Sequence, residues 1–265
     1  MAVRFTLLGD IEVLLDGRPL AVGHLRQRGV LAALVVDAPR VVPVDRLADR
    51  VWADRPPQRF RSTLYSYLSR LRQALAAAEE HGVHIGREPG GYRLTVDRST
   101  VDLHRFRDLA AQARAARAAQ DGERAAGLFQ RALGQWQAET FAGMDTPWFN
   151  ELRDTLARER LAAELDGNDI ALRQGRHSEL LAPLTARAAT YPLDERLAGQ
   201  LMLALYRAGR AADALAHYRN LREHLAEELG VDPSDSLRGL HQQLLTGDPG
   251  AAAPGWRTWP SGAPP

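Results

Sequence analysis

The sequence predicts an α+β N-terminal region followed by an all-α region built from helical repeats. Apolar runs of strand length, bounded by turn residues, occur only before Val101. Helical periodicity then continues to about Leu245. Within that stretch Leu172–Ala182 aligns with Tyr206–Ala216 at an offset that equals the tetratricopeptide period, so we expect stacked helical hairpins.

The composition excludes several classes of chemistry. The chain is long enough for two domains with separate cores, it has no cysteine, and all its 34 Lys+Arg positions are arginine. Disulfides, thiolate metal sites, lysine Schiff bases and the P-loop lysine are therefore excluded. Residues 1–100 hold 15 arginines against 11 acidic residues, whereas the remainder holds 19 against 22. This asymmetry indicates an anionic partner for the first part of the chain.

The N-terminal segment does not have the pattern of a signal peptide, because Asp10 and Glu12 interrupt its apolar residues. No apolar run approaches the length of a membrane span. We therefore expect a soluble, cytoplasmic protein.

Residues 3–22 predict a small antiparallel sheet, because short apolar runs are separated by Gly-Asp at 9–10 and Asp-Gly at 16–17. From Leu25 the apolar period lengthens, which predicts helices over 25–36 and 44–52. Two prolines follow at 56 and 57. Because proline is tolerated at a helix start, we expect a third helix to begin there.

The third helix, within Arg55–Ala78, carries five arginines and no acidic residue. Leucines recur at helical spacing and form the stripe that packs against the first two helices. These are Leu64, Leu68, Leu71 and Leu75. A helical projection gathers the following residues on the opposite face: Arg59, Ser62, Ser66, Ser69, Arg70 and Gln73. Thr63 flanks that face on one side, and Tyr65 and Arg72 flank it on the other.

Residues 84–96 predict a β-hairpin with a Pro-Gly-Gly tip at 89–91. A basic helix followed by a hairpin is the arrangement of a winged helix-turn-helix, in which the hairpin, or wing, contacts an adjacent groove or the DNA backbone. Arg87 and Arg93 are therefore phosphate candidates, and we expect Tyr92 to be a core residue. Arg26 and Arg28, at the start of the first helix, are secondary phosphate candidates.

The polar face of the third helix suits base recognition, because arginine binds guanine bidentately and serine can donate or accept. An ordinary solvated surface would mix positive and negative charges, whereas this stretch has no acidic residue. Arg59 and Arg61 also lie near the positive end of the helix dipole, where a cation is unfavourable without an anionic partner. The base-facing candidates are Arg59, Ser62, Ser66, Ser69 and Arg70. The phosphate candidates are Arg55, Thr63, Arg72, Arg87 and Arg93.

Catalytic patterns are poor throughout the chain. His81 and His84 lie near Glu79, Glu80 and Glu88, a group that a solvated loop explains better than a metal site. The sequence has no nucleophile elbow, zinc-binding motif or phosphate-binding glycine loop. We therefore predict that the protein is not an enzyme and has neither a metal site nor a cofactor.

Helical patterns divide the second region into seven segments: 102–119, 122–137, 147–174, 177–190, 194–208, 211–229 and 234–245. The A-x-x-x-aromatic element of the repeat occurs twice, at 125–129 and 214–218, and Leu180 and Pro183 interrupt it in the middle copy. Stacked repeats offer a concave surface to protein partners. The predicted domains are thus 1–98 and 99–246, followed by a Pro- and Gly-rich tail at 247–265. We expect the tail to be disordered, with Trp256 and Trp259 able to dock elsewhere.

Five segments, in this order, resemble the Streptomyces antibiotic regulatory protein family: LRQRGVLAALVV, VVPVDRLADRVWADRPP, TLYSYLSRLRQAL, GGYRLTV and VDLHRF. The later stretch Arg196–Leu245 is similar to the bacterial transcriptional activation domain of that family. The resemblance covers about residues 3–245. It implies a winged helix-turn-helix like that of response-regulator effector domains, followed by a tetratricopeptide-like activation domain.

The resemblance also implies a function. Members bind direct repeats at promoters, often overlapping the −35 element, and recruit RNA polymerase with its principal sigma factor to switch on secondary-metabolite (antibiotic) gene clusters. The resemblance places the recognition helix at about Arg59–Ala77. It also implies that two copies bind the DNA as a head-to-tail dimer and that the protein is associated with the nucleoid. It suggests the loop with Trp52, Asp54 and Pro56 as a polymerase or sigma contact.

Two features depart from the family pattern. Residues 59–61 are bulkier than the small residues expected there, which could alter the bases that are read. Pro43 stands where a helix-capping serine is common, so the second helix lacks the usual cap. Larger members append an ATPase domain, for which we expect no counterpart in a sequence of this length without lysine. An alternative interpretation is a repeat-based interaction scaffold whose first domain binds protein rather than DNA.

Overall fold

The computed structural model describes residues 2–247 and divides the chain into two compact units. Unit 1 comprises Met1–Ala113 and Leu128–Leu161, and unit 2 comprises Arg114–Gly127 and the chain from Ala162 onward. Unit 1 thus extends past the predicted domain boundary at residue 98. Apart from Gly247, the tail predicted to be disordered lies outside the described residues, as do its two tryptophans.

Unit 1 begins with a three-stranded antiparallel sheet of β1 (Val3–Thr6), β2 (Glu12–Leu15) and β3 (Arg18–Pro19). Val3 pairs with Leu15, and the turn between β2 and β3 has positive φ at Asp16 (50°) and Gly17 (78°). This is the primed turn that Asp-Gly favours, so the predicted hairpin is confirmed.

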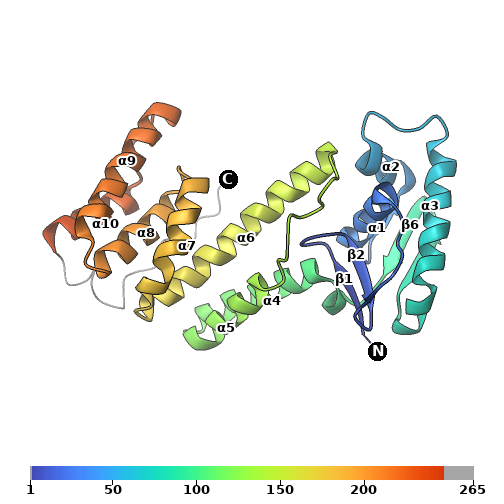
Figure 1. The fold of residues 1–265 in the computed structure, drawn as a ribbon, viewed down its shortest axis with the longest axis horizontal. Coiled ribbons are helices and arrows are strands. Elements are labelled where there is room, and N and C mark those ends of the chain that lie inside the picture. Colours follow the sequence, from blue (N-terminus) through green and yellow to red (C-terminus); the bar gives the residue numbers. More distant parts are fainter. Residues whose placement is uncertain (1, 248–265) are drawn as a thin grey trace. The chain divides into compact units, whose positions relative to one another are not determined.

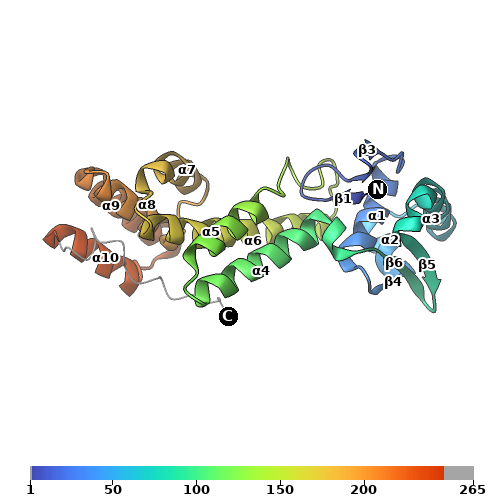
Figure 2. The same ribbon diagram turned by 90° about the horizontal axis from the view of Figure 1, so that it is seen from below.

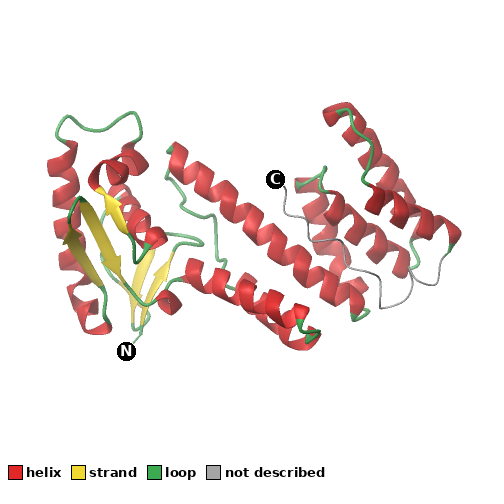
Figure 3. Ribbon diagram, turned by 180° about the vertical axis from the view of Figure 1, so that it is seen from behind, coloured by secondary structure: helices red, strands yellow, loops and turns green. Residues whose placement is uncertain are grey.

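The sheet is followed by a winged helix-turn-helix (Figure 1). Its elements are α1 (Leu25–Asp37), β4 (Val41–Pro43), α2 (Val44–Trp52), α3 (Phe60–Leu75), a 3₁₀ segment (Ala76–His81), β5 (His84–Glu88) and β6 (Gly91–Thr95). The strands form a second sheet in the order β4-β6-β5, shown in yellow in Figure 3. The central residues of α1, from Val30 to Val35, are all apolar, and each is at most 1% exposed, so this part of the helix is buried on every side. The predicted α+β architecture is confirmed.

Two predicted helix ends are wrong. The third helix begins at Phe60 rather than at the two prolines, because a residue before proline is kept extended and Pro56 itself precedes Pro57. The helix predicted over 122–137 ends at Leu133. There Trp136 turns inward to meet the edge of Phe106, with 5.3 Å between ring centroids, which a continuing helix would prevent.

Residues 134–146 connect α5 (Gly122–Leu133) to α6 (Pro147–Arg173) and pack against the N-terminal sheet and α2. The backbone N–H of Gln137 donates to the carbonyl oxygen of Leu8 (2.9 Å), and Thr146 Oγ1 donates to that of Arg50 (2.7 Å). This connection explains why unit 1 contains residues far beyond the winged helix-turn-helix.

The helix α4 (Asp102–Ala118), which follows a short 3₁₀ turn at Arg98–Thr100, is fixed by its first residue to the connection between β1 and β2. The Asp102 carboxylate, only 2% exposed, accepts the backbone N–H groups of Leu7, Leu8 and Leu103. Burial raises the pKa of Asp102 above the usual aspartate value, although these hydrogen bonds oppose the shift.

Unit 2 is all helical, with α7 (His177–Thr190), α8 (Glu195–Arg207), α9 (Ala211–Leu229) and α10 (Asp235–Thr246) after the end of α6 (Figures 1 and 2). The repeat predicted from the offset is confirmed at the turns: Gly175 and Gly209 both have φ of 77°. Ala214 and Tyr218 of the repeat element are buried, whereas Leu180 is half-buried. Within residues 2–247, no helix has the length and apolar character needed to cross a membrane.

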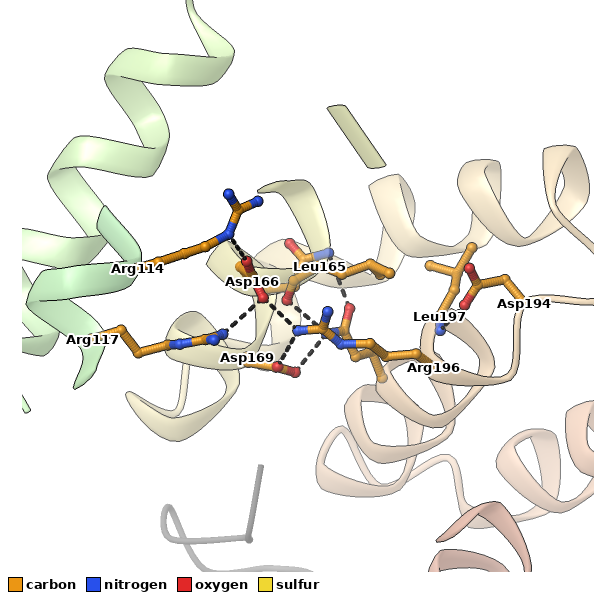
Figure 4. A network of polar contacts seen from close by, with 10 residues as sticks. Arg114, Arg117, Leu165, Asp166, Asp169, Asp194, Arg196 and Leu197 are labelled. Carbon is orange, nitrogen blue, oxygen red and sulfur yellow. Dashed lines mark hydrogen bonds and ion pairs between the residues drawn. The ribbon is translucent and has the colours of Figure 1, made fainter. Parts of the chain in front are cut away.

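A buried ion network joins three helices of unit 2 (Figure 4). Asp166 of α6 is 6% exposed and pairs with Arg114 (2.9 Å) and Arg117 (2.7 Å) of α4 and with Arg196 (2.8 Å) of α8. Arg196 also pairs with Asp169 (2.7 Å). Burial alone would raise the pKa of Asp166, but the arginines outweigh it and hold the pKa below the usual value.

Candidate nucleic-acid interface

The outward face of α3 is accessible to a partner. All five residues predicted to face bases are exposed: Arg59, Ser62, Ser66, Ser69 and Arg70. The leucine stripe on the opposite face is at most 2% exposed. The helix is thus held from behind by apolar packing, which leaves a polar, acid-free face toward solvent.

The N-terminus of α3 differs from the predicted helix start. Arg59 is the N-cap residue rather than part of the helix, with φ of −110° and ψ of 46°. Its carbonyl oxygen accepts hydrogen bonds from Ser62 Oγ (2.9 Å) and Thr63 Oγ1 (3.2 Å). The helix has neither a side-chain cap nor an acidic residue in its first turn. Its terminal N–H groups and dipole therefore favour an anion at this end.

The wing lies beside α3 (Figure 2) and its tip is a glycine turn. Gly90 has φ of 83°, and a Cβ at Gly91 would collide with the carbonyl oxygen of Val42 in β4. Only glycine fits at 91 because β6 pairs with β4 at that position. Arg87 and Arg93, the predicted phosphate contacts of the wing, are exposed.

Arg72 has an intramolecular role that the sequence did not indicate. It is half-buried, its Nε donates to the carbonyl oxygen of Ile85 in β5 (2.8 Å), and its guanidinium lies 5.4 Å from the ring centroid of Tyr92. Tyr92 is 5% exposed, so its prediction as a core residue is confirmed. Arg72 thereby ties α3 to the wing.

A cleft of about 540 Å³ separates α3 from the wing and the start of α2. Its lining residues are Val44, Asp45, Arg61, Tyr65, Arg87, Glu88, Pro89, Gly90, Gly91 and Tyr92. Tyr65 is 42% exposed and its ring centroid lies 6.3 Å from that of Tyr92. Pro43 is the N-cap of α2 and provides no side-chain cap, as its sequence position predicted.

The loop between α2 and α3 presents only part of the predicted polymerase contact. Trp52 is 7% exposed and stacks on Tyr67, with 6.0 Å between ring centroids. Its side chain therefore supports the loop from inside. Asp54 and Pro56 are exposed, as is the predicted phosphate contact Arg55.

Several arginines of unit 1 are used within the fold. Arg26 donates to the carbonyl oxygen of Val51, and Arg28 donates to that of Gly23 (2.9 Å). Arg50 is 7% exposed, pairs with Asp37 (2.7 Å) and lies 4.4 Å from the ring centroid of Trp148. Net charge in the sequence therefore overstates the charge available to an anionic partner.

Two family models match the chain. The transcriptional regulatory protein C-terminal family matches residues 23–94, and the bacterial transcriptional activator domain matches residues 101–245, more than half of the chain. The regulatory protein DnrI of Streptomyces peucetius is 32% identical over an alignment of 265 positions, and the alignment covers 94% of each chain. The chain belongs to the Streptomyces antibiotic regulatory protein family. This is a family of transcriptional regulators rather than of enzymes.

Other members of this family are longer. The regulatory protein AfsR of Streptomyces coelicolor is 41% identical over 95% of this chain, which spans only 25% of that relative. The solved structure of Mycobacterium tuberculosis EmbR in complex with a low affinity phosphopeptide superimposes with a TM-score of 0.87 at 33% identity. That match covers 92% of this chain and 65% of EmbR. The predicted family and architecture are thus confirmed.

Sequence reasoning missed the acidic residues of the cleft. Asp45 lies beside Arg61 because α2 meets α3 in space, and no local pattern marks that meeting. Glu88 and Arg93 lie on the two strands of the wing, and their pairing follows from the hairpin. Within residues 2–247, no group of three or more His, Asp or Glu side chains is placed to hold a metal ion.

Proposed function

We propose that this member of the family is a transcriptional activator that binds duplex DNA through α3 and the wing. The supporting observation is the exposed, acid-free face of α3 directly beside a wing that carries two exposed arginines. A helix of this width fits the major groove, and a wing beside it reaches the flanking backbone or groove.

The proposed contacts follow from exposure and chemistry. Arg70, Ser66 and Ser69 lie in the middle of the exposed face and are proposed to contact base edges, together with Ser62 and Arg59 toward the N-terminus. Ser62 already donates its hydroxyl proton to the Arg59 carbonyl, so it would act toward DNA as an acceptor.

Backbone phosphates are proposed for a second set of residues: Arg55, Thr63, Arg72, Arg87 and Arg93. Arg55, Arg87 and Arg93 are exposed, and Thr63 is half-buried at the N-terminal end of α3, where the helix dipole favours an anion. Because Arg72 Nε is bound to Ile85, only its terminal nitrogens are proposed to reach a phosphate.

Three further features of promoter activation are proposed: the arrangement of two copies on DNA, the contact with RNA polymerase, and the binding of further protein partners. Two copies bind direct repeats near the −35 region head to tail, and the loop with exposed Asp54 and Pro56 contacts RNA polymerase or its principal sigma factor. The helical repeats offer a surface for further protein partners. The regulated genes are proposed to be a secondary-metabolite cluster, and the protein would then reside on the nucleoid in the cytoplasm.

Salt-dependent gel shifts test the DNA-binding proposal. The full chain is titrated onto duplexes from the upstream regions of its own genomic neighbourhood at a series of salt concentrations, and protected sequences are footprinted. We expect binding whose affinity falls linearly on a logarithmic salt scale, by about 0.9 per phosphate neutralised. Absence of salt-sensitive duplex binding would favour the alternative, a scaffold whose first domain binds protein.

A further inference from the structure

The cleft between α3 and the wing has two acidic side chains beside its arginines. Asp45 lies in the first turn of α2, and Glu88 is the last residue of β5. Arg61 Nη2 is 2.9 Å from Asp45 Oδ1, and Arg93 Nη2 is 2.5 Å from Glu88 Oε1. Both ion pairs therefore border the surface proposed for DNA.

Stability of the fold does not account for these pairs. The side chains of Arg61 and Asp45 are 61% and 73% exposed, and those of Arg93 and Glu88 are 45% and 30% exposed. Exposed ion pairs contribute little to folding, because water screens them and ordering two long side chains costs entropy. The role of these ion pairs is therefore better inferred from where they lie in the fold.

The pairs occur at selected arginines of the interface. Within the part of the chain that the structure describes, Arg59, Arg70 and Arg87 take part in no ion pair. The arginines that do are Arg61 on α3, which lines the cleft, and Arg93 on the wing, which does not. Both belong to the two elements that are proposed to bind DNA.

The partner of Arg61 comes from α2, since α3 has no acidic residue of its own, whereas Glu88 and Arg93 lie on the two paired strands of the wing. The backbone N–H of Val44, at the start of α2, donates to the carbonyl oxygen of Gly90 at the wing tip (3.4 Å). This contact holds the first turn of α2 against the wing and keeps Asp45 at the cleft. Asp45 is thus held there by the packing of α2 against the wing, and Glu88 by the pairing of β5 with β6.

We propose that Asp45 and Glu88 are internal competitors of DNA phosphates, each occupying an arginine that would otherwise neutralise the backbone. The proposal rests on the proposed DNA-binding function. A carboxylate beside each arginine cancels its charge at the interface, whether or not the arginine changes partners. The two pairs thus lower the affinity for duplex of any sequence, which is mainly electrostatic, and binding depends more on the base contacts of α3.

The test measures duplex affinity against salt for Asp45→Asn and Glu88→Gln. Each substitution frees one arginine, so the logarithmic salt slope should steepen by about 0.9. Affinity for an unrelated duplex at about 0.1 M salt should rise roughly three- to ten-fold, the size expected for one pair of unit charges about 4 Å apart in water, roughly 1 kcal/mol. Thermal unfolding of each variant verifies that the fold is retained.

The matched control is Asp108→Asn, which removes the same charge from an exposed ion pair of unit 1 with Arg98 (3.1 Å). It should change affinity less than two-fold. If Asp45→Asn and Glu88→Gln match this control while the unmodified chain binds DNA in a salt-dependent way, the competitor proposal is wrong and the DNA-binding proposal stands. Weaker binding by either variant would also overturn it, because the carboxylate would then position its arginine for DNA.

Discussion

Two arginines of α3 show how surroundings decide the role of a side chain. Arg70 lies on the outward face, is exposed, and makes no ion pair within the described residues. Arg72 lies on the flank toward the wing and is bound to the backbone of Ile85. A free guanidinium can bind a guanine edge bidentately, whereas a tethered one serves mainly to hold two elements together.

For Arg70→Ala we expect a loss of roughly 1–3 kcal/mol of specific binding and relaxed base choice at one operator position. Stability should not change, because among residues 2–247 the side chain has no hydrogen-bond or ion-pair partner. Competition gel shifts against single-base operator variants measure the effect. An equal loss on all sequences would instead assign Arg70 to a phosphate.

For Arg72→Ala we expect weaker binding to every sequence and a free energy of unfolding lower by about 1–2 kcal/mol, because a part-buried hydrogen bond is lost. Urea unfolding and gel shifts provide the two measurements. The salt slope separates two contributions: a slope flatter by about one unit indicates a phosphate contact. An unchanged slope with reduced stability would limit Arg72 to its structural role. Full stability with unchanged binding would contradict both roles.

At the scale of elements, local patterns in the sequence were sufficient for most helices and strands. The turn residues at 16–17 and 89–91 and the glycines 175 and 209 mark chain reversals that the structure contains. The exposed face of α3 was equally predictable, because a helical projection needs only the period of the helix. Its start and the end of α5 were not, since prolines and the inward turn of Trp136 decide them.

Features that depend on distant partners were beyond the sequence. Thr146 donates to the carbonyl oxygen of Arg50, far away in the chain, and nothing periodic marks the segment that makes this contact. The same reason hides the burial of Trp52 under Tyr67 and the pairing of Asp45 with Arg61. From a single sequence, the exposed face of a helix can be predicted more readily than the distant residues that pack against that helix.

Two glycines of unit 2, one at a repeat turn and one inside a helix, offer substitutions with opposite expected effects on stability. Gly209 has φ of 77° at the turn before α9, so Gly209→Ala should destabilise the protein by about 1 kcal/mol. Gly239 lies inside α10 with open space around it, so Gly239→Ala should stabilise by roughly 0.5–1 kcal/mol. Urea unfolding of both variants measures the difference. Equal effects would mean that the left-handed turn is not required at 209.

The ion network of unit 2 predicts an acid-dependent contribution to stability. The pKa of Asp166 is lower in the folded chain than its usual value near 4, so its contribution is complete above that value. It is then lost as the pH falls through the usual value toward the folded one. Asp166→Asn should cost about 3 kcal/mol at pH 7, because Arg114 and Arg117 lose their carboxylate partner and Arg196 keeps only Asp169.

Unfolding of the unmodified chain and of Asp166→Asn, measured from pH 7 to pH 3, checks this prediction. The difference between the two should shrink as the pH falls below about 4. Asp213→Asn, in an exposed pair with Arg210 of the same unit, is the control and should cost less than about 0.5 kcal/mol at any pH. A difference that stays constant with pH would show that the loss at Asp166 is not electrostatic.

At the scale of the whole molecule, charged residues are distributed unevenly between the two parts of the chain. Arginines exceed acidic residues in the first hundred residues, and acidic residues exceed arginines in the rest. The proposed electrostatic attraction to DNA would therefore come from the winged helix-turn-helix, although several of its arginines are used within the fold. A single recognition helix reads few base pairs, so two copies on a repeated site are a natural way to reach promoter specificity.

Head-to-tail binding makes a prediction about the phase of the two half-sites. Adjacent copies on a direct repeat must face the same side of the duplex, so their spacing should be close to one helical turn, about 10–10.5 base pairs. Inserting about 5 base pairs between footprinted half-sites turns one copy to the opposite side and should abolish cooperativity, lowering the affinity of the second copy about 5- to 150-fold. Gel shifts on duplexes with 0, 5 and 10 inserted base pairs measure the affinity of the second copy.

Because a contact between adjacent copies also requires proximity, the 10-base-pair insertion should restore the phase and only part of the coupling. If the second copy binds equally well at all three spacings, the copies bind independently and the head-to-tail dimer is wrong.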